Sequence, residues 1–152
     1  MVTHRSAKAW PPRLEGRAPL PLPIAVLLLP VIVAWTLPQT LAGVAIALLR
    51  LGEGYRPSLC RFGPFLFVVI RARGPLSAGI SLGVVVFAQT HEILKHELCH
   101  LITGLWLSWS YLAVYGLEYL LAGHDRSPHE RVTCWLERRL TWGWSVVGGW
   151  SS

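Results

Sequence analysis

A long stretch without charge near the N-terminus constrains this chain more than any other feature. Between Arg17 and Arg50 the sequence contains no Asp, Glu, Lys or Arg, and most of its residues are apolar. About 20 apolar residues are enough for a helix to cross a bilayer. We therefore expect residues 19–51 to form a transmembrane segment, preceded by a basic N-terminal tail at residues 1–18.

Two prolines, Pro30 and Pro38, interrupt this segment. Because proline removes a helix hydrogen bond and its ring clashes with the preceding turn, we expect one tilted, kinked helix that crosses once. A hairpin of two shorter helices that dips into the bilayer and returns is the alternative. A cleaved leader ending near Ala42 and Gly43 would also suit the basic start, but the apolar run continues to Leu51.

The composition favours a lipid bilayer as partner and disfavours nucleic acid. Hydrophobic residues make up 53 % of the chain and charged residues 14 %, against about 25 % charged in soluble domains. The net charge is +6, but the basic residues are scattered and form no dense run with interleaved aromatics. They flank the apolar segment on both sides, so the positive-inside rule predicts no orientation. Three cysteines without a C-x-x-C pair predict no disulfide framework.

The pattern of apolar and polar residues at 52–140 predicts a small α+β domain. Two aromatic and β-branched runs, 65–70 and 80–88, predict two strands. A turn at residues 73–75, Arg-Gly-Pro, would join them as an antiparallel hairpin. Thr90 is a good N-cap for a following helix and Glu92 lies in the first turn of that helix.

Two further helices are expected before the end of the chain. Residues 101–117 are uncharged and rich in aromatic side chains, as in a helix that lies in the membrane interface. Ser127 and Pro128 suit the N-cap and first residue of a last helix that runs through Arg139. The tail at 141–152 is rich in Trp and Gly. The sequence thus predicts an α+β membrane protein.

The helix that follows Thr90 contains the motif H-E-x-x-H, with His96, Glu97 and His100 at its fixed positions. Residues four apart lie on one helix face, so both imidazoles can bind one metal ion. Glu97 is rotated about 100° around the helix, where it can reach a water on the metal rather than the metal itself. Two imidazoles and a carboxylate in this order indicate zinc-dependent hydrolysis, with Zn²⁺ as the expected cofactor.

A hydrolytic zinc site needs a third protein ligand, and the local sequence does not fix it. The longer pattern H-E-x-x-H-x-x-G-x-x-H fails, because Thr103 and Trp106 stand where Gly and His are required. Each alternative has an ordinary structural role as well: a carboxylate at an interface, an exposed turn residue, or an acid at a helix start. The candidates are Glu118, His124, Asp125, His129 and Glu130.

The chain resembles a group of small bacterial membrane proteins that share several segments in one order. The matching segments are 36–49, Ile-Ser-Leu-Gly-Val-Val-Val at 80–86, His-Glu-Leu-Cys-His at 96–100, and Ser-Pro-His-Glu at 127–130. Ser127 and His129 stand where Asn and Phe are usual. The resemblance covers residues 24–138. It implies a zincin-like domain at 52–140 in the bacterial cytoplasmic membrane, with His96 and His100 as ligands, Glu97 as acid and base, and Glu130 as third ligand.

These observations predict a membrane-anchored zinc metallopeptidase-like protein that acts on a peptide or protein substrate. Glu97 would be its general base, and Tyr111, Tyr115 or His129 would stabilise the oxyanion. The alternative is a non-catalytic membrane scaffold or partner-binding subunit with a structural zinc or no metal.

Overall fold

The computed structural model describes residues 20–52, 55–71, 79–123, 126–140 and 143–149. The expected tail at 1–18, the predicted turn at 73–75 and the candidate ligands His124 and Asp125 lie outside these residues. The described elements confirm a mixed α+β fold. In chain order they are α1 (Leu22–Trp35), α2 (Leu37–Gly52), β1 (Pro57–Phe62), β2 (Phe65–Arg71), β3 (Ile80–Leu82), β4 (Val85–Ala88), α3 (His91–Leu107), the 3₁₀ turn η2 (Ser108–Ser110), α4 (Tyr111–Ala122), α5 (Pro128–Arg139) and β5 (Trp144–Gly149).

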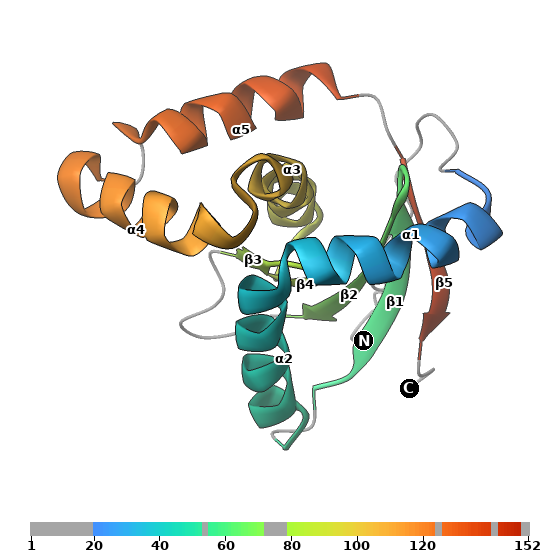
Figure 1. Cartoon of the computed structure of the whole chain (residues 1–152). Helices are drawn as coiled ribbons and strands as arrows, with labels where there is room; N and C mark the ends of the chain where they lie inside the picture. Colours follow the sequence, from blue (N-terminus) through green and yellow to red (C-terminus); the bar gives the residue numbers. More distant parts are fainter. Residues whose placement is uncertain (1–19, 53–54, 72–78, 124–125, 141–142, 150–152) are drawn as a thin grey trace, which may run out of the picture.

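The strands form one sheet in the order β3-β4-β2-β1-β5, with helices on both faces (Figure 1). Alternate residues of β2 and β4 supply two apolar cores, because successive side chains of a strand point to opposite faces. Phe67 and Val86 pack with α3 and α1 on one face, whereas Ile70 and Phe87 pack with α2 on the other. Strands buried on both faces explain the continuous apolar runs in the sequence.

The predicted antiparallel pairing of the two apolar runs is wrong. β2 pairs with β4 in parallel, and residues 80–88 are themselves a hairpin of β3 and β4. The reason is Gly83, which has a φ of +59° and turns the chain between Leu82 and Val85. Glycine with positive φ at the first turn position is typical of a two-residue hairpin. A Cβ at Gly83 would also collide with Thr40 of α2.

Two strands were not expected from the sequence. β1 pairs antiparallel with β2 through the turn at Gly63, and β5 pairs antiparallel with β1. β1 buries only alternate residues, Cys60 and Phe62, so it carries polar residues between them and lacks a continuous apolar run. β5 comes from the Trp- and Gly-rich tail.

The expected single kinked helix is instead two helices, α1 and α2, bent by 99° at Thr36. Pro38 lacks the N–H that would bond to the carbonyl of Ala34, and a residue before proline is biased away from helical geometry. The Ala34 carbonyl accepts a hydrogen bond from the Trp109 indole at 2.9 Å instead. Pro30, in contrast, lies inside α1 without ending it.

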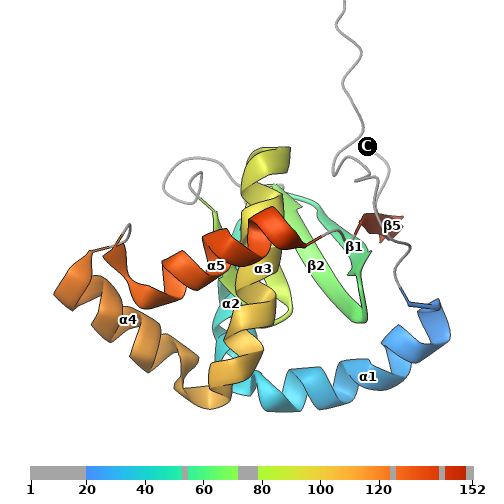
Figure 2. The same ribbon diagram turned by 90° about the horizontal axis from the view of Figure 1, so that it is seen from above.

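Within the described residues, two stretches have the length and hydropathy of a membrane span. One is the bent pair α1–α2, and the other is the helical stretch His91–Ala122. The second stretch contains α3, which is a core helix because Leu94 and Leu98 are fully buried against the sheet. The chain changes direction at Ser108, whose φ is +48°, so that α4 leaves the line of α3 (Figure 2).

Candidate metal site

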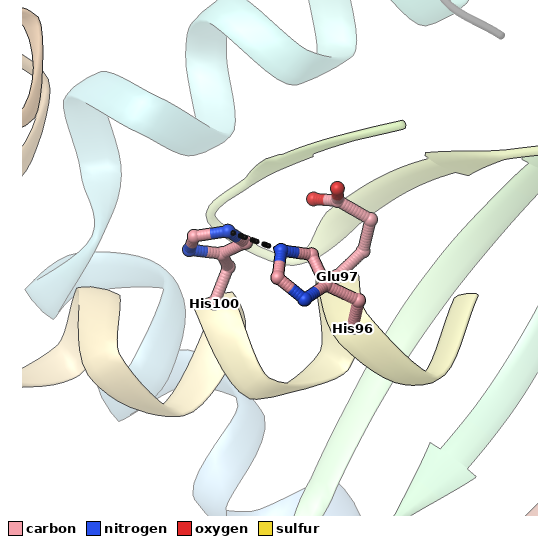
Figure 3. Close-up of side chains that lie close together, drawn as sticks. All are labelled: His96, Glu97 and His100. Atoms are coloured by element: carbon pink, nitrogen blue, oxygen red, sulfur yellow. Dashed lines mark hydrogen bonds between the residues drawn. The ribbon is translucent and has the colours of Figure 1, made fainter. Parts of the chain in front are cut away.

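The motif residues lie on α3 as the sequence predicts. Thr90 caps this helix by accepting a hydrogen bond from the backbone N–H of Ile93 at 3.3 Å. His96 and His100 project from adjacent turns, and their Nε2 atoms are 3.1 Å apart. Figure 3 shows a nitrogen of each ring directed toward the other ring, with the Glu97 carboxylate near them; the ring planes are 82° apart. His100 is 5 % exposed, whereas the side chain of His96 is 22 % exposed.

The carboxylate of Glu130 completes a triangle with the two rings. Its Oε2 lies 3.2 Å from His96 Nε2, and its Oε1 lies 3.1 Å from His100 Nε2. Tetrahedral zinc with bonds of about 2.0–2.1 Å places neighbouring ligand atoms about 3.3–3.4 Å apart. The Nε2–Nε2 distance and the two N–O distances, which involve different oxygens of Glu130, are therefore each within a few tenths of an ångström of the separation between neighbouring zinc ligands. Two His and one Glu are also a usual donor set for catalytic zinc.

Helix α5 brings Glu130 to this place, and its start is fixed by two hydrogen bonds and a proline. Ser127 caps the helix by accepting from the Glu130 N–H at 3.0 Å, and Pro128 is its first residue, as predicted. Glu118 of α4 accepts from the backbone N–H of His129 at 2.9 Å. The first turn of α5 is thus held from two sides, and α5 packs across α3 (Figure 2).

Glu97 lies beside the triangle in a cavity of about 240 Å³. One wall of the cavity is the edge strand β3 with Ile80 and Ser81, and another is α4 with Tyr111 and Tyr115. Ligand atoms of His96, Glu97 and His100 lie within 4.8 Å of one another, and Glu97 is 5 % exposed. The carboxylate is thus close enough to act on a water at the triangle.

Gly79 leaves the space that the Glu97 carboxylate occupies. A Cβ at this position would lie 2.6 Å from Glu97 Oε1 and 2.6 Å from Ile93 Cγ2. Gly79 also has a φ of +94°, which side chains other than glycine rarely adopt. The segment before β3 therefore sets the position of the carboxylate.

The site perturbs the pKa of each of its charged groups. The hydrogen bond to Glu130 raises the pKa of His96 to about 9, against the opposing effect of burial. Burial raises the pKa of Glu97 to about 8, although nearby His96 lowers it. Burial would also raise the pKa of Glu130, but hydrogen bonds from His100 and His96 outweigh it and hold that pKa well below its usual range. Without metal, Glu130 is thus an anion paired with a protonated His96.

In the described part of the chain, Glu118 and His129, the other two third-ligand candidates, have other partners. Glu118 is bonded to the start of α5, as described. His129 stacks on the His100 ring at 5.4 Å between centroids and shares a hydrogen bond with Thr103 at 3.0 Å. Burial lowers the pKa of His129, so its ring is neutral where it stacks on His100. Among the described residues, a second group of candidate ligands within 4.8 Å of one another is His96, Glu130 and Cys134.

Two neighbours of the histidines were not expected from the sequence, and both lie on α5. Glu137 Oε2 is 3.2 Å from His96 Nδ1, and Thr133 Oγ1 is 3.3 Å from His100 Nδ1. Thr133 follows Glu130 by three residues and Glu137 follows it by seven, so all three lie on one face of the helix. A helix that starts at Ser127 therefore predicts that Thr133 and Glu137 share the face of Glu130.

Comparison of this chain with family profiles, with curated proteins and with solved structures finds no match. The chemistry of the site therefore has to be inferred from its own residues.

Proposed function

We propose that this protein is a membrane-associated, zinc-dependent peptidase with His96, His100 and Glu130 as metal ligands. The observation that supports this proposal most is that the two Nε2 atoms lie 3.1 Å apart, each with one Glu130 oxygen at 3.1–3.2 Å, next to a buried carboxylate. Fixed ligands and a nearby general base in one cavity are the parts that metal-assisted hydrolysis needs.

Glu97 would move the proton in this reaction. Zinc at the triangle would lower the pKa of a bound water toward 7 and polarise a substrate carbonyl. Glu97 takes one proton from the attacking water as its oxygen bonds to the carbonyl carbon. The same carboxyl then gives that proton to the amide nitrogen as the C–N bond breaks, which leaves a carboxylic acid, with the second water proton, and an amine.

The edge strand β3 favours an extended peptide as substrate. β3 is the last strand of the sheet on this side and lines the cavity through Ile80 and Ser81. An extended chain can add to a sheet edge through main-chain hydrogen bonds. A peptide placed along β3 would present its carbonyl groups to the triangle and to Glu97.

Membrane association is supported by the apolar surface of α1, α2 and α4. Soluble monomers rarely expose large contiguous apolar patches, whereas apolar helices without charge suit the hydrocarbon layer. The most exposed of these side chains, each at least 58 % accessible, are Leu27 and Val31 on α1, Leu41, Leu48 and Leu49 on α2, and Leu117, Leu120 and Leu121 on α4.

The helix breaks at Thr36 and Ser108 lie together, and side chains at each break hydrogen-bond the backbone carbonyls of the other. This arrangement also favours a lipid environment. At the end of α1, the carbonyl of Trp35 accepts from Ser108 Oγ at 2.7 Å, and that of Ala34 accepts from the Trp109 indole. In return, the Trp35 indole donates to the carbonyl of Leu105 at 2.8 Å, and Gln39 donates to that of Ser108 at 2.6 Å. Backbone carbonyls in lipid must be bonded within the protein, since no water is available.

The bend between α1 and α2 favours entry into the bilayer without crossing. At 1.5 Å per residue, helices of 14 and 16 residues are about 21 and 24 Å long. Each is shorter than the hydrocarbon core of about 30 Å, and the 99° bend prevents them from adding their lengths. The proposed anchor is therefore closer to the dipping hairpin than to the single span.

The catalytic proposal is tested by metal content and hydrolysis together. Purified protein in detergent should contain one zinc per chain, and His96→Ala should remove it. Glu97→Gln should keep the zinc but abolish cleavage of a library of fluorescence-quenched peptides, whereas Glu92→Gln, an exposed acid on the same helix, should change neither. Wild-type protein without stoichiometric metal would reject the proposal. Zinc without cleavage of any peptide would favour the scaffold alternative.

Membrane association is tested by flotation with neutral phosphatidylcholine vesicles, which removes surface charge as a cause. Leu48→Lys and Leu49→Lys together should shift the protein to the bottom fraction, because lysine is unfavourable in the hydrocarbon layer. Val132→Lys on α5 is the matched control and should still float. Equal flotation of all variants, or no flotation of the wild type, would contradict the proposed anchor.

A further inference from the structure

The His96 ring has less support from its surroundings than the His100 ring. The side chain of His96 is 22 % exposed, whereas that of His100 is 5 % exposed and stacks on His129. His100 Nδ1 also contacts the buried hydroxyl of Thr133 at 3.3 Å. Packing therefore orients His100 from several sides, and His96 depends more on its hydrogen-bonding partners.

Helix α5 contacts both nitrogen atoms of the His96 ring. Glu130 lies at Nε2 and Glu137 at Nδ1, each at 3.2 Å. Residues seven apart on a helix share a face, so one rigid element presents the two carboxylates on opposite edges of one ring. A neutral imidazole that donates its Nδ1–H to Glu137 has a lone pair on Nε2, directed toward the triangle.

An exposed ion pair is the ordinary interpretation of the Glu137–His96 contact. Glu137 is 28 % exposed, and pairs of this kind contribute little to the free energy of unfolding. A carboxylate behind a ligating histidine has a different effect, because it fixes the tautomer and the ring orientation and raises the basicity of the other nitrogen. The two interpretations predict different measurements.

We propose that Glu137 is a positioning residue, which orients His96 and fixes its Nδ1–H tautomer for metal binding. The proposal rests on the metal site assigned under the proposed function. It assigns α5 two tasks: Glu130 binds the metal directly, and Glu137 acts on the metal through His96. The donor set is thus asymmetric, since His96 has an anionic partner and His100 a neutral hydroxyl.

The test compares zinc affinity with the stability of the metal-free protein. Zinc dissociation constants are measured on the full chain in detergent by competition with a chromogenic chelator at pH 9.5, where protons compete least for His96. Loss of the carboxylate behind a ligating histidine typically weakens metal binding about 10–100-fold. Glu137→Ala should show this loss, and Glu137→Gln, which keeps an acceptor oxygen, should show a smaller one.

Two controls separate positioning from general effects of charge or folding. Glu92→Gln removes the same charge one turn before His96 and should change the affinity less than threefold. Metal-free Glu137→Gln should unfold within a few degrees of the wild type, and ¹⁵N NMR of the metal-free wild type at pH 9.5 should show the neutral His96 ring protonated at Nδ1, a preference that metal-free Glu137→Ala should lose.

Three results would overturn the proposal. The first is Glu137→Ala binding zinc as tightly as the wild type, and the second is Glu92→Gln weakening zinc as much as Glu137→Gln. The third is a His96 tautomer that does not depend on residue 137. If the wild type itself binds no zinc, the proposed metal site fails first, and this inference fails with it.

Discussion

Zinc and protons should compete for the same groups, and the pKa values of the site predict how strongly. The Nε2 atom of His96 must lose its proton before it can bind zinc. Its pKa of about 9 in the metal-free protein means that about 99 % of His96 is protonated at pH 7. Glu97, with a pKa of about 8, is about 90 % protonated at the same pH. A divalent ion beside Glu97 favours its charged form, so its proton should leave as well.

The expected magnitude follows from this count of protons. Zinc binding at pH 7 should release about one proton from His96 and up to about 0.9 from Glu97. The apparent affinity should therefore rise with pH, by about 10-fold to 50-fold between pH 7 and pH 8, and level off above pH 9. Glu97→Gln removes one of the two protons, so its affinity should rise only about tenfold over the same interval.

Isothermal titration calorimetry in two buffers of different ionisation enthalpy measures the protons released directly. We expect close to two for the wild type and close to one for Glu97→Gln, with Glu92→Gln behaving as the wild type. Release of no proton at pH 7, or an affinity that is constant from pH 7 to pH 9, would refute the assignment of His96 as a ligand paired with Glu130.

Four substitutions provide further tests. Glu130→Ala should lose stoichiometric zinc by elemental analysis, whereas Glu118→Gln should retain it and only lower the thermal unfolding temperature; zinc loss in both would mean that α5 docking, not ligation, is the cause. Gly79→Ala should cost about 1–3 kcal/mol in denaturant unfolding, because of its positive φ, and should reduce peptide cleavage with zinc retained; normal cleavage would show that Glu97 is not held there. Ser127→Ala should cost about 1 kcal/mol through loss of the cap, and no change would contradict the role of the cap.

The helices that carry the site could be predicted because their signals are local. Thr90 caps α3 and Ser127 caps α5, and each cap bonds to a backbone N–H three residues later. Such contacts depend only on neighbouring residues, so they can be read from a short window of sequence. The spacing of His96 and His100 on one helix face follows from the same geometry.

The pairing of the strands could not be predicted because the decisive contacts are distant in sequence. The run at 80–88 reads as one strand, but Gly83 packs against Thr40 of α2 and turns the chain there. The 99° bend at Thr36 also depends on distant contacts, since the backbone carbonyls at the end of α1 accept hydrogen bonds from Ser108 and Trp109. Prolines in the sequence indicate a break but not its angle.

The site was predictable in part. Glu130 was one of several candidates, and its distances to His96 and His100 distinguish it from Glu118 and His129. The sequence does not indicate Glu137 as a site residue, because a carboxylate late in a helix beside Arg138 and Arg139 is typical of a solvated surface. Its contact with His96 depends on the crossing of α5 over α3, which the sequence does not show.

The crossing of α5 over α3 has a consequence for how an ion would be kept and lost. His100 belongs to α3 and Glu130 to α5, so an ion bound by both would cross-link two helices that are separated in the sequence by α4. Such a cross-link closes a loop and restricts the unfolded chain. Fraying of α5 from its last turn would withdraw Glu137 first and Glu130 afterwards, so the rate of ion escape should follow amide hydrogen exchange along α5.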